Sequence, residues 1–141
     1  MIDVTVSREM RAAPERVRAV MFEPRNDPQW MAAVKSVQPE GTSDTPGARV
    51  RRIGRFLGRE LRWTTELVST SPTHVELRII DGPMRGTVRY EIVPSAAGSR
   101  VTIRNTGEAP GFAPKPLLKF MMRRSLNADL RRLQDVVEHS A

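Results

Sequence analysis

The chain of 141 residues contains no cysteine, which excludes disulfide bonds and thiolate chemistry. Its two histidines, His74 and His139, are far apart, so neither a histidine-rich metal site nor a Ser-His-Asp triad is expected. No apolar run approaches the roughly 20 residues that span a bilayer, and the N-terminus lacks the apolar stretch of a signal peptide. We therefore expect a cytoplasmic protein with no membrane span, no metal and no cofactor.

Lysine is scarce, and arginine supplies almost all of the positive charge. Three of the 23 basic residues are lysines, which leaves 20 arginines against 16 acidic residues and a formal charge of +7. A balance this basic raises the possibility of a nucleic-acid partner. The arginines are dispersed along predicted strands, however, as on a solvated face. We therefore do not expect nucleic acid as the main partner.

The residue pattern predicts a single α+β domain over residues 1–141. Residues 2–10 alternate apolar and polar side chains as in a half-buried strand. Two short helices follow over 13–24 and 26–34, with Pro14 and Pro28 in their first turns and Asn26 or Asp27 as the cap of the second. Six short alternating runs fill residues 34–108. A helix from Leu117 to about His139 ends the chain and should cover the concave face of the sheet.

The arginine-rich stretch RVRRIGRFLGRELRWTTEL (49–67) predicts a hairpin with its turn at Leu57-Gly58. Cross-strand partners then have numbers summing to 115, which pairs Arg49 with Glu66 and Arg52 with Trp63. One face of this hairpin is charged and partly self-neutralising, as expected for a solvent-facing side. The other face is apolar except for Arg52, so Arg52 is predicted to point inward.

The last helix also directs a charged residue inward, because its apolar stripe contains Asp129 and has Ser125 at its edge. A carboxylate on an apolar stripe is costly unless it is paired. Arg52 is therefore the predicted partner of Asp129. The pair would be either a structural bridge between helix and sheet or a polar anchor inside a ligand cavity.

The order of one strand, two short helices, six strands and a long helix resembles the SRPBCC (START-like, helix-grip) superfamily, and specifically its bacterial polyketide cyclase/dehydrase-type branch. The resemblance covers nearly the whole chain and rests on residues 12–34, 46–68, 98–108 and 123–134. It implies a cavity between a curved seven-stranded antiparallel sheet and the C-terminal helix, suited to a lipid, polyketide or aromatic acid. It also implies that residues 107–116 lie at the mouth, with Phe112 as a lid residue.

Three functions remain open, in decreasing order of preference. The first is a carrier or sensor that binds a hydrophobic small molecule without transforming it, with a carboxylate or phenolate of the ligand meeting Arg52. The second is a metal-free cyclase or dehydratase that uses Tyr90, Asp129 and Arg52. The third is a partner-binding protein that uses the arginine-rich outer sheet. We lean away from an enzyme, and we expect a monomer or homodimer.

The candidate ligand-binding residues are the larger and polar side chains predicted to face the cavity. For Trp30, Trp63 and Tyr90 the default role is that of a core residue, and the pocket wall is the alternative. The cavity could also be filled by Phe56, Trp63, Met84 and Met122. The complete set is Trp30, Arg52, Trp63, Thr65, Met84, Tyr90, Asn105, Phe112, Met122, Ser125 and Asp129.

Overall fold

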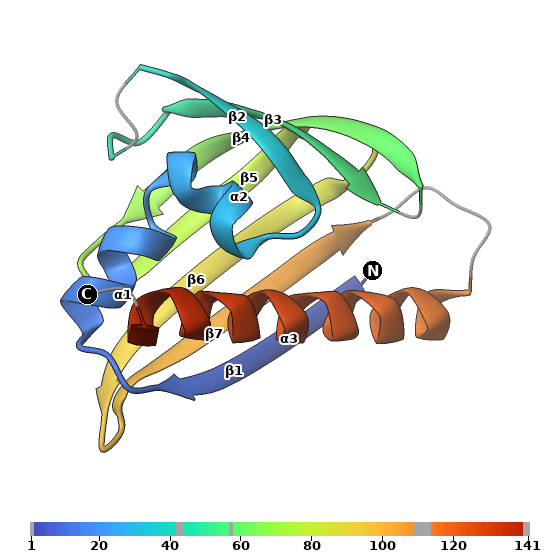
Figure 1. The fold of residues 1–141 in the computed structure, drawn as a ribbon. Helices are drawn as coiled ribbons and strands as arrows, with labels where there is room; N and C mark the ends of the chain where they lie inside the picture. Colours follow the sequence, from blue (N-terminus) through green and yellow to red (C-terminus); the bar gives the residue numbers. More distant parts are fainter. Residues whose placement is uncertain (1, 42–43, 57, 109–113, 140–141) are drawn as a thin grey trace.

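The computed structural model describes residues 2–41, 44–56, 58–108 and 114–139, and it has the predicted α+β helix-grip fold (Figure 1). Its elements are β1 (Ile2–Met10), α1 (Pro14–Met21), the 3-10 turn η1 (Pro24–Asn26), α2 (Asp27–Trp30), β2 (Val34–Glu40), β3 (Arg49–Phe56), β4 (Arg59–Thr70), β5 (His74–Asp81), β6 (Arg85–Ser95), β7 (Gly98–Glu108) and α3 (Lys115–His139). All neighbouring strands are antiparallel, in the order β1-β7-β6-β5-β4-β3-β2.

The predicted register of the β3–β4 hairpin is confirmed. Arg49 pairs with Glu66, Arg52 with Trp63, and Gly54 with Leu61. The predicted faces are also confirmed, because Val50, Arg52, Thr65 and Leu67 are buried whereas the alternate arginines of β3 are exposed. Of the predicted turn, Leu57 lies outside the described residues. Inward alternation therefore places Arg52 on the concave face.

The second predicted helix is much shorter than expected. It consists of one turn, because the backbone is already extended at Met31. Neither Asn26 nor Asp27 acts as the predicted side-chain cap. The Asn26 side-chain amide instead donates to the carbonyls of Ala19 and Val20 at 3.4 and 3.3 Å, which ties η1 back to α1. Asp27 is thereby left available for a different partner.

The long helix α3 lies over one side of the concave face, along β1 (Figure 1). Its buried residues Leu126, Leu130, Leu133 and Val137 pack into a core with the inward side chains of β1, β6 and β7. The short helices α1 and α2 lie beside α3 and extend toward β2. Among the described residues, no helix is both long and apolar enough to cross a membrane.

The outer face of the sheet carries alternating arginines and acids in ion pairs. Both oxygens of Asp3 accept hydrogen bonds from Arg104, at 3.1 and 2.8 Å. Glu66 accepts from Arg78 at 3.1 Å and lies 3.6 Å from Arg49. Further pairs are Arg51–Glu40, Arg89–Glu91, Arg89–Glu76 and Arg100–Glu9. These contacts offset much of the positive charge of this face and weaken its attraction for polyanions.

Gly54 and Gly86, both inside strands, make room for neighbouring backbone. At Gly54, an added Cβ would lie 1.7 Å from the Ala33 carbonyl oxygen. The same carbonyl accepts a 2.8 Å hydrogen bond from the Arg55 amide. The residue at position 54 must therefore lack a side chain for the 31–34 segment to dock on β3.

Replacing Gly54 with alanine is expected to destabilise the fold by about 2–3 kcal/mol, because one of the two backbone segments must move. Urea unfolding followed by circular dichroism measures this loss. Gly58→Ala is the control, because a Cβ there would have no neighbour within 4 Å, although its φ of +78° carries its own strain. A Gly54→Ala protein no less stable than the Gly58→Ala control would contradict the proposed docking.

Candidate ligand pocket

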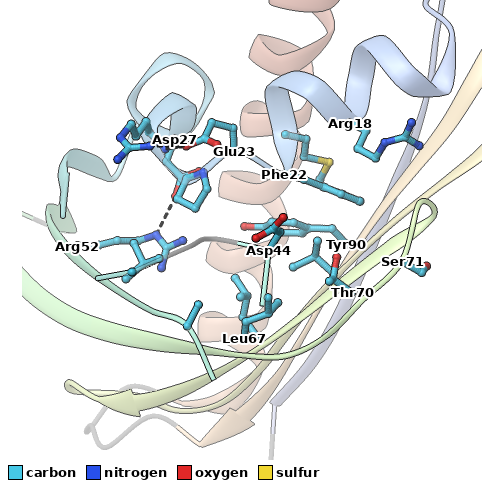
Figure 2. A pocket seen from close by; sticks show the side chains of 18 of the residues that line it. Arg18, Phe22, Glu23, Asp27, Asp44, Arg52, Leu67, Thr70, Ser71 and Tyr90 are labelled. Carbon is cyan, nitrogen blue, oxygen red and sulfur yellow. Dashed lines mark hydrogen bonds and ion pairs between the residues drawn. The ribbon is translucent and has the colours of Figure 1, made fainter. Parts of the chain in front are cut away.

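A pocket of about 660 Å³ lies between the α1–η1–α2 segment and the concave side of β3 to β6 (Figure 2). Its floor is apolar and comes from β3, β4 and β5, while Met21 and Phe22 close it from the helical side. Lining residues are Arg18, Met21, Phe22, Glu23, Pro24, Arg25, Asp27, Gly41, Asp44, Ala48, Val50, Arg52, Leu67, Thr70, Ser71, Pro72, Val75, Leu77 and Tyr90. No residue of α3 lines this pocket, so its position differs from the cavity expected against the C-terminal helix.

Arg52 and Asp27 form a buried ion pair at one end of the pocket. The Arg52 Nε donates to Asp27 Oδ2 at 2.7 Å, and the side chains are only 5% and 2% exposed. A second nitrogen of the same guanidinium, Nη1, donates to the Thr65 hydroxyl. The dashed line in Figure 2 joins the ion pair across the gap between α2 and β3. The predicted Arg52–Asp129 pair is therefore wrong, and Asp27 takes the place of Asp129.

Burial has a strong influence on the acids of this region. The pKa of Asp27 is raised by loss of solvent, and the Arg52 charge and hydrogen bond only partly oppose that rise. The pKa of Tyr90 is also raised, chiefly by burial and then by the negative charge of Asp27. The Tyr90 hydroxyl therefore stays protonated at physiological pH and can donate a hydrogen bond but cannot act as a base.

Tyr90 and Phe22 form part of the pocket wall, and Trp30 packs behind Tyr90. The Tyr90 ring is stacked on Phe22 with centroids 6.5 Å apart, and Trp30 meets it edge-on at 5.8 Å. Trp30 is fully buried on the far side of Tyr90 and does not line the pocket. Its Nε1 has no hydrogen-bond partner among the described residues. This aromatic group holds the α1–α2 segment at a fixed distance from β6.

Asp129 is buried as predicted, but its partners lie outside the pocket. Its Oδ1 accepts from the Arg132 guanidinium and from the Ala32 amide, the latter at 3.3 Å. Burial raises the pKa of Asp129, while these two contacts act in the opposite direction. Arg132 also donates to the Trp30 carbonyl at 3.0 Å. Asp129 therefore joins α3 to the segment that follows α2, and neither role expected for an Arg52–Asp129 pair applies to it.

The other predicted site residues are spread over the concave side. Of the members of this set that the structure describes, only Arg52 and Tyr90 line the pocket, and Thr65 accepts a hydrogen bond from Arg52. Asn105 has a buried Oδ1 without a hydrogen-bond partner in the part of the chain that the structure describes. Half-buried positions away from the lining are Trp63, Met84, Met122 and Ser125. Phe112, the predicted lid residue, lies outside the described residues.

The rim of the pocket carries charged side chains, and a hydrogen bond between α1 and the β4–β5 turn closes one side of it. Arg18 of α1 donates to the Pro72 carbonyl at 2.7 Å, which connects the helical side to the β4–β5 turn. Glu23 and Arg25 are 3.6 Å apart at the opposite edge. Asp44 lies above the floor in Figure 2. An apolar floor with a charged rim suits a ligand that buries its apolar body and leaves any charged end near solvent.

Neither histidine contributes a reactive group to the interior of the pocket. His74 is half-buried at the β4–β5 turn, with its ring nitrogens bound to the hydroxyls of Ser69 and Ser71 at 3.0 and 2.7 Å. His139 is exposed at the end of α3. Within the described ranges, no three His, Cys, Asp or Glu side chains are grouped so that they could hold a metal ion.

Sequence reasoning missed Asp27 and most of the helical wall. One signal was available, since Asn26 and Asp27 are successive residues that can both cap a helix and only one of them could do so. If Asn26 is the cap, Asp27 is free for another role. No comparable signal marked Arg18, Phe22 or Glu23, because their place depends on how α1 lies over the sheet.

Comparisons with known proteins agree with this architecture. The chain superposes on TTHA0849 from Thermus thermophilus with a TM-score of 0.81 and 20% identity, covering 96% of each chain. A START superfamily protein from Mycobacterium smegmatis gives a TM-score of 0.83 and 17% identity, covering 96% of this chain and 97% of that one. CV1439 from Chromobacterium violaceum gives 0.75 and 16%, covering 99% and 100%. At these identities the likeness shows the fold alone.

A match to a family model goes further than these superpositions. No curated protein matches the chain significantly. The model described as polyketide cyclase / dehydrase and lipid transport matches residues 1–138, which is almost the whole sequence. The same helix-grip arrangement is seen in the START-like structures. The chain therefore belongs to the polyketide cyclase / dehydrase and lipid transport family, and this membership suggests binding of a hydrophobic ligand.

Proposed function

We propose that the protein binds a hydrophobic small molecule of lipid or polyketide type in the 660 Å³ pocket and acts as its carrier or sensor. The observation that carries this proposal is an apolar floor of ligand size with one buried polar pair at its end. Small-molecule sites typically occupy about 300–1,000 Å³ and combine apolar walls with a few placed polar groups.

The buried ion pair favours a neutral polar group on the ligand. Arg52 is already matched by Asp27 at 2.7 Å, so the pair has no net charge to offer. A ligand carboxylate placed beside Arg52 would also stand beside the Asp27 carboxylate and be repelled by it. A hydroxyl or carbonyl meets no such cost, because it can exchange hydrogen bonds with the pair or with the Tyr90 hydroxyl. An aromatic acid would have to direct its carboxylate toward the rim.

Nile red, a neutral apolar dye, is expected to bind the purified protein saturably, with increased fluorescence. Ala48→Trp should weaken binding by on the order of tenfold or more, because Ala48 is half-buried on the pocket wall and an indole there would occupy ligand volume. Native mass spectrometry of the same preparation should show any co-purifying molecule, which extraction would then identify.

Val68→Trp is the matched control, since Val68 lies one residue after the pocket-lining Leu67 and is 39% exposed. It should leave dye binding unchanged, and both variants should unfold cooperatively near the wild-type midpoint. Absence of both a co-purifying molecule and saturable dye binding would contradict the proposal. Equal loss of binding in the two variants would show that the dye binds elsewhere.

A cyclase or dehydratase is the second candidate, and the protonated Tyr90 hydroxyl at the pocket wall is the observation in its favour. Asp129 does not join Tyr90 and Arg52 there, so the available acid would be Asp27. The same mass spectrometry distinguishes the two candidates. A carrier returns its bound molecule unchanged, whereas a dehydratase returns a product lighter by one water. A cyclase that releases no water returns an isomer of equal mass, which chromatography before mass spectrometry separates from the starting molecule.

A further inference from the structure

The first half of α3 carries several basic residues and no acidic one. From residue 109 to residue 128 the sequence has four basic residues and no acidic one. Lys115, Lys119, Arg123 and Arg124 are all exposed. None of the four forms a salt bridge within the part of the chain that the structure describes, in contrast to the paired arginines of the outer sheet. This half-helix is therefore a cationic surface.

The same half-helix exposes large apolar side chains. Phe120 is 62% exposed and Leu117 is 49% exposed, the two highest values among the large apolar side chains of the described residues. Leu117 lies nine residues before the buried Leu126, and at about 100° per residue the two point in opposite directions. Phe120 follows Leu117 by three residues and so shares its outer side. No core packing explains this exposure.

We propose that the first half of α3, from Lys115 to Arg124, docks the protein on an anionic lipid surface. Leu117 and Phe120 would enter the boundary between headgroups and acyl chains. Arg123 and Arg124, which lie within about 60° of Phe120 around the helix, would contact lipid phosphates. Helices that lie in a membrane interface combine these two features, a basic polar side and exposed Leu or Phe. The helix would lie on the bilayer and not cross it, in keeping with its hydropathy.

The apolar residues decide between a lipid surface and other polyanions. A nucleic-acid backbone would take up the cations but would leave Leu117 in water, because base stacking uses aromatic side chains and not aliphatic ones. An acidic protein could cover both residue types, but it needs a groove of matching shape. A bilayer interface is deformable and accepts both residue types without shape matching. Charge and exposed apolar area together therefore favour lipid.

The test is co-sedimentation of the full chain with unilamellar vesicles of phosphatidylcholine, alone or mixed with phosphatidylglycerol. We expect binding to the mixed vesicles only, decreasing as sodium chloride is raised. Phe120→Gln should weaken binding by on the order of tenfold, because a phenyl ring that would be buried in the membrane interface is replaced by a polar amide. Arg123→Gln with Arg124→Gln should have an effect of similar size, since each cation near the surface contributes separately.

Matched controls separate this surface from general charge and from the pocket. Val93→Gln removes an apolar side chain that is 40% exposed on the sheet, and Arg59→Gln with Arg85→Gln removes two exposed cations elsewhere. Neither should alter vesicle binding. Nile red binding should stay normal in the α3 variants, so that this inference and the proposed function fail independently.

Three results would overturn the inference. One is absence of binding to anionic vesicles at low salt. Another is vesicle binding that the control variants weaken as much as the α3 variants do. The third is a dimer that Phe120→Gln converts to a monomer without any vesicle binding, which would assign the face to a second copy of the chain.

Discussion

Replacing Arg52 with methionine is expected to destabilise the protein by about 3–5 kcal/mol at neutral pH, because the Asp27 carboxylate is left buried without its cation. Methionine keeps much of the side-chain volume, so the loss reports charge more than packing. The double variant Asp27→Leu with Arg52→Met removes both charges and should recover most of that loss. Urea unfolding of the wild type, the single variant and the double variant measures all three stabilities.

The same series has a predicted pH dependence. The pKa of Asp27 is raised in the folded protein, mainly by burial, and removing Arg52 takes away the main effect that opposes this rise. A folded-state pKa above the unfolded one means that the folded protein binds the proton more tightly. Stability of Arg52→Met should therefore be greatest in acid and fall as pH rises through the raised pKa of Asp27. Its deficit relative to wild type should be larger at about pH 8 than at about pH 5.

The double variant serves as the control for this pH effect, because it has no carboxyl at position 27. Its difference from wild type should lack the extra deficit that the single variant develops with rising pH. A single variant as stable as the double variant at both pH values would contradict the ion pair of Arg52 and Asp27. Dye binding in the double variant then shows whether the pair also contacts the ligand.

Replacing Trp30 with alanine is expected to cost about 3–5 kcal/mol, the usual loss for a large buried aromatic side chain. Trp30 is 0% exposed and supports Tyr90 from behind through an edge contact at 5.8 Å. Its loss leaves a void between α2 and β6, next to the pocket wall. Urea unfolding gives the change in stability, and Nile red titration shows whether Tyr90 still holds the wall in place.

Trp63→Ala removes the same type of side chain from a half-buried position on β4. It should cost less than half as much, because less of the indole is withdrawn from water. Dye binding should be weaker in Trp30→Ala than in Trp63→Ala if the α2 segment supports the pocket. Similar losses of stability in both variants would show that the packing of Trp30 in α2 contributes no more to stability than the half-buried Trp63 of β4.

The fold could be predicted from local patterns because each element leaves a periodic signature in the sequence. Alternation over 49–67, together with a two-residue turn placed at Leu57-Gly58, was sufficient for the hairpin register and for the inward direction of Arg52. The apolar stripe predicted for α3 likewise contains all of its buried residues, Asp129 included, although Leu118, Met122 and Val136 of the same stripe are only half-buried. These features depend on contacts between residues close in sequence, or on the regular spacing at which one face of a strand or helix recurs along the chain. The helix boundaries were less accurate where one turn, Asp27–Trp30, was too short to show a period.

Which buried acid meets Arg52 was decided only by the tertiary structure. Asp27 and Asp129 were both available, and pairing depended on which helix lies over β3. The same placement of the helices puts the pocket beneath α1 and α2, and it leaves Asp129 to pair with Arg132 of its own helix. Periodicity fixes the side that each element presents, but the distance and angle between elements follow from the packing of residues far apart in sequence. The sequence by itself thus determined the family, the fold and the inward direction of Arg52. The packing of the helices on the sheet determined that Arg52 pairs with Asp27.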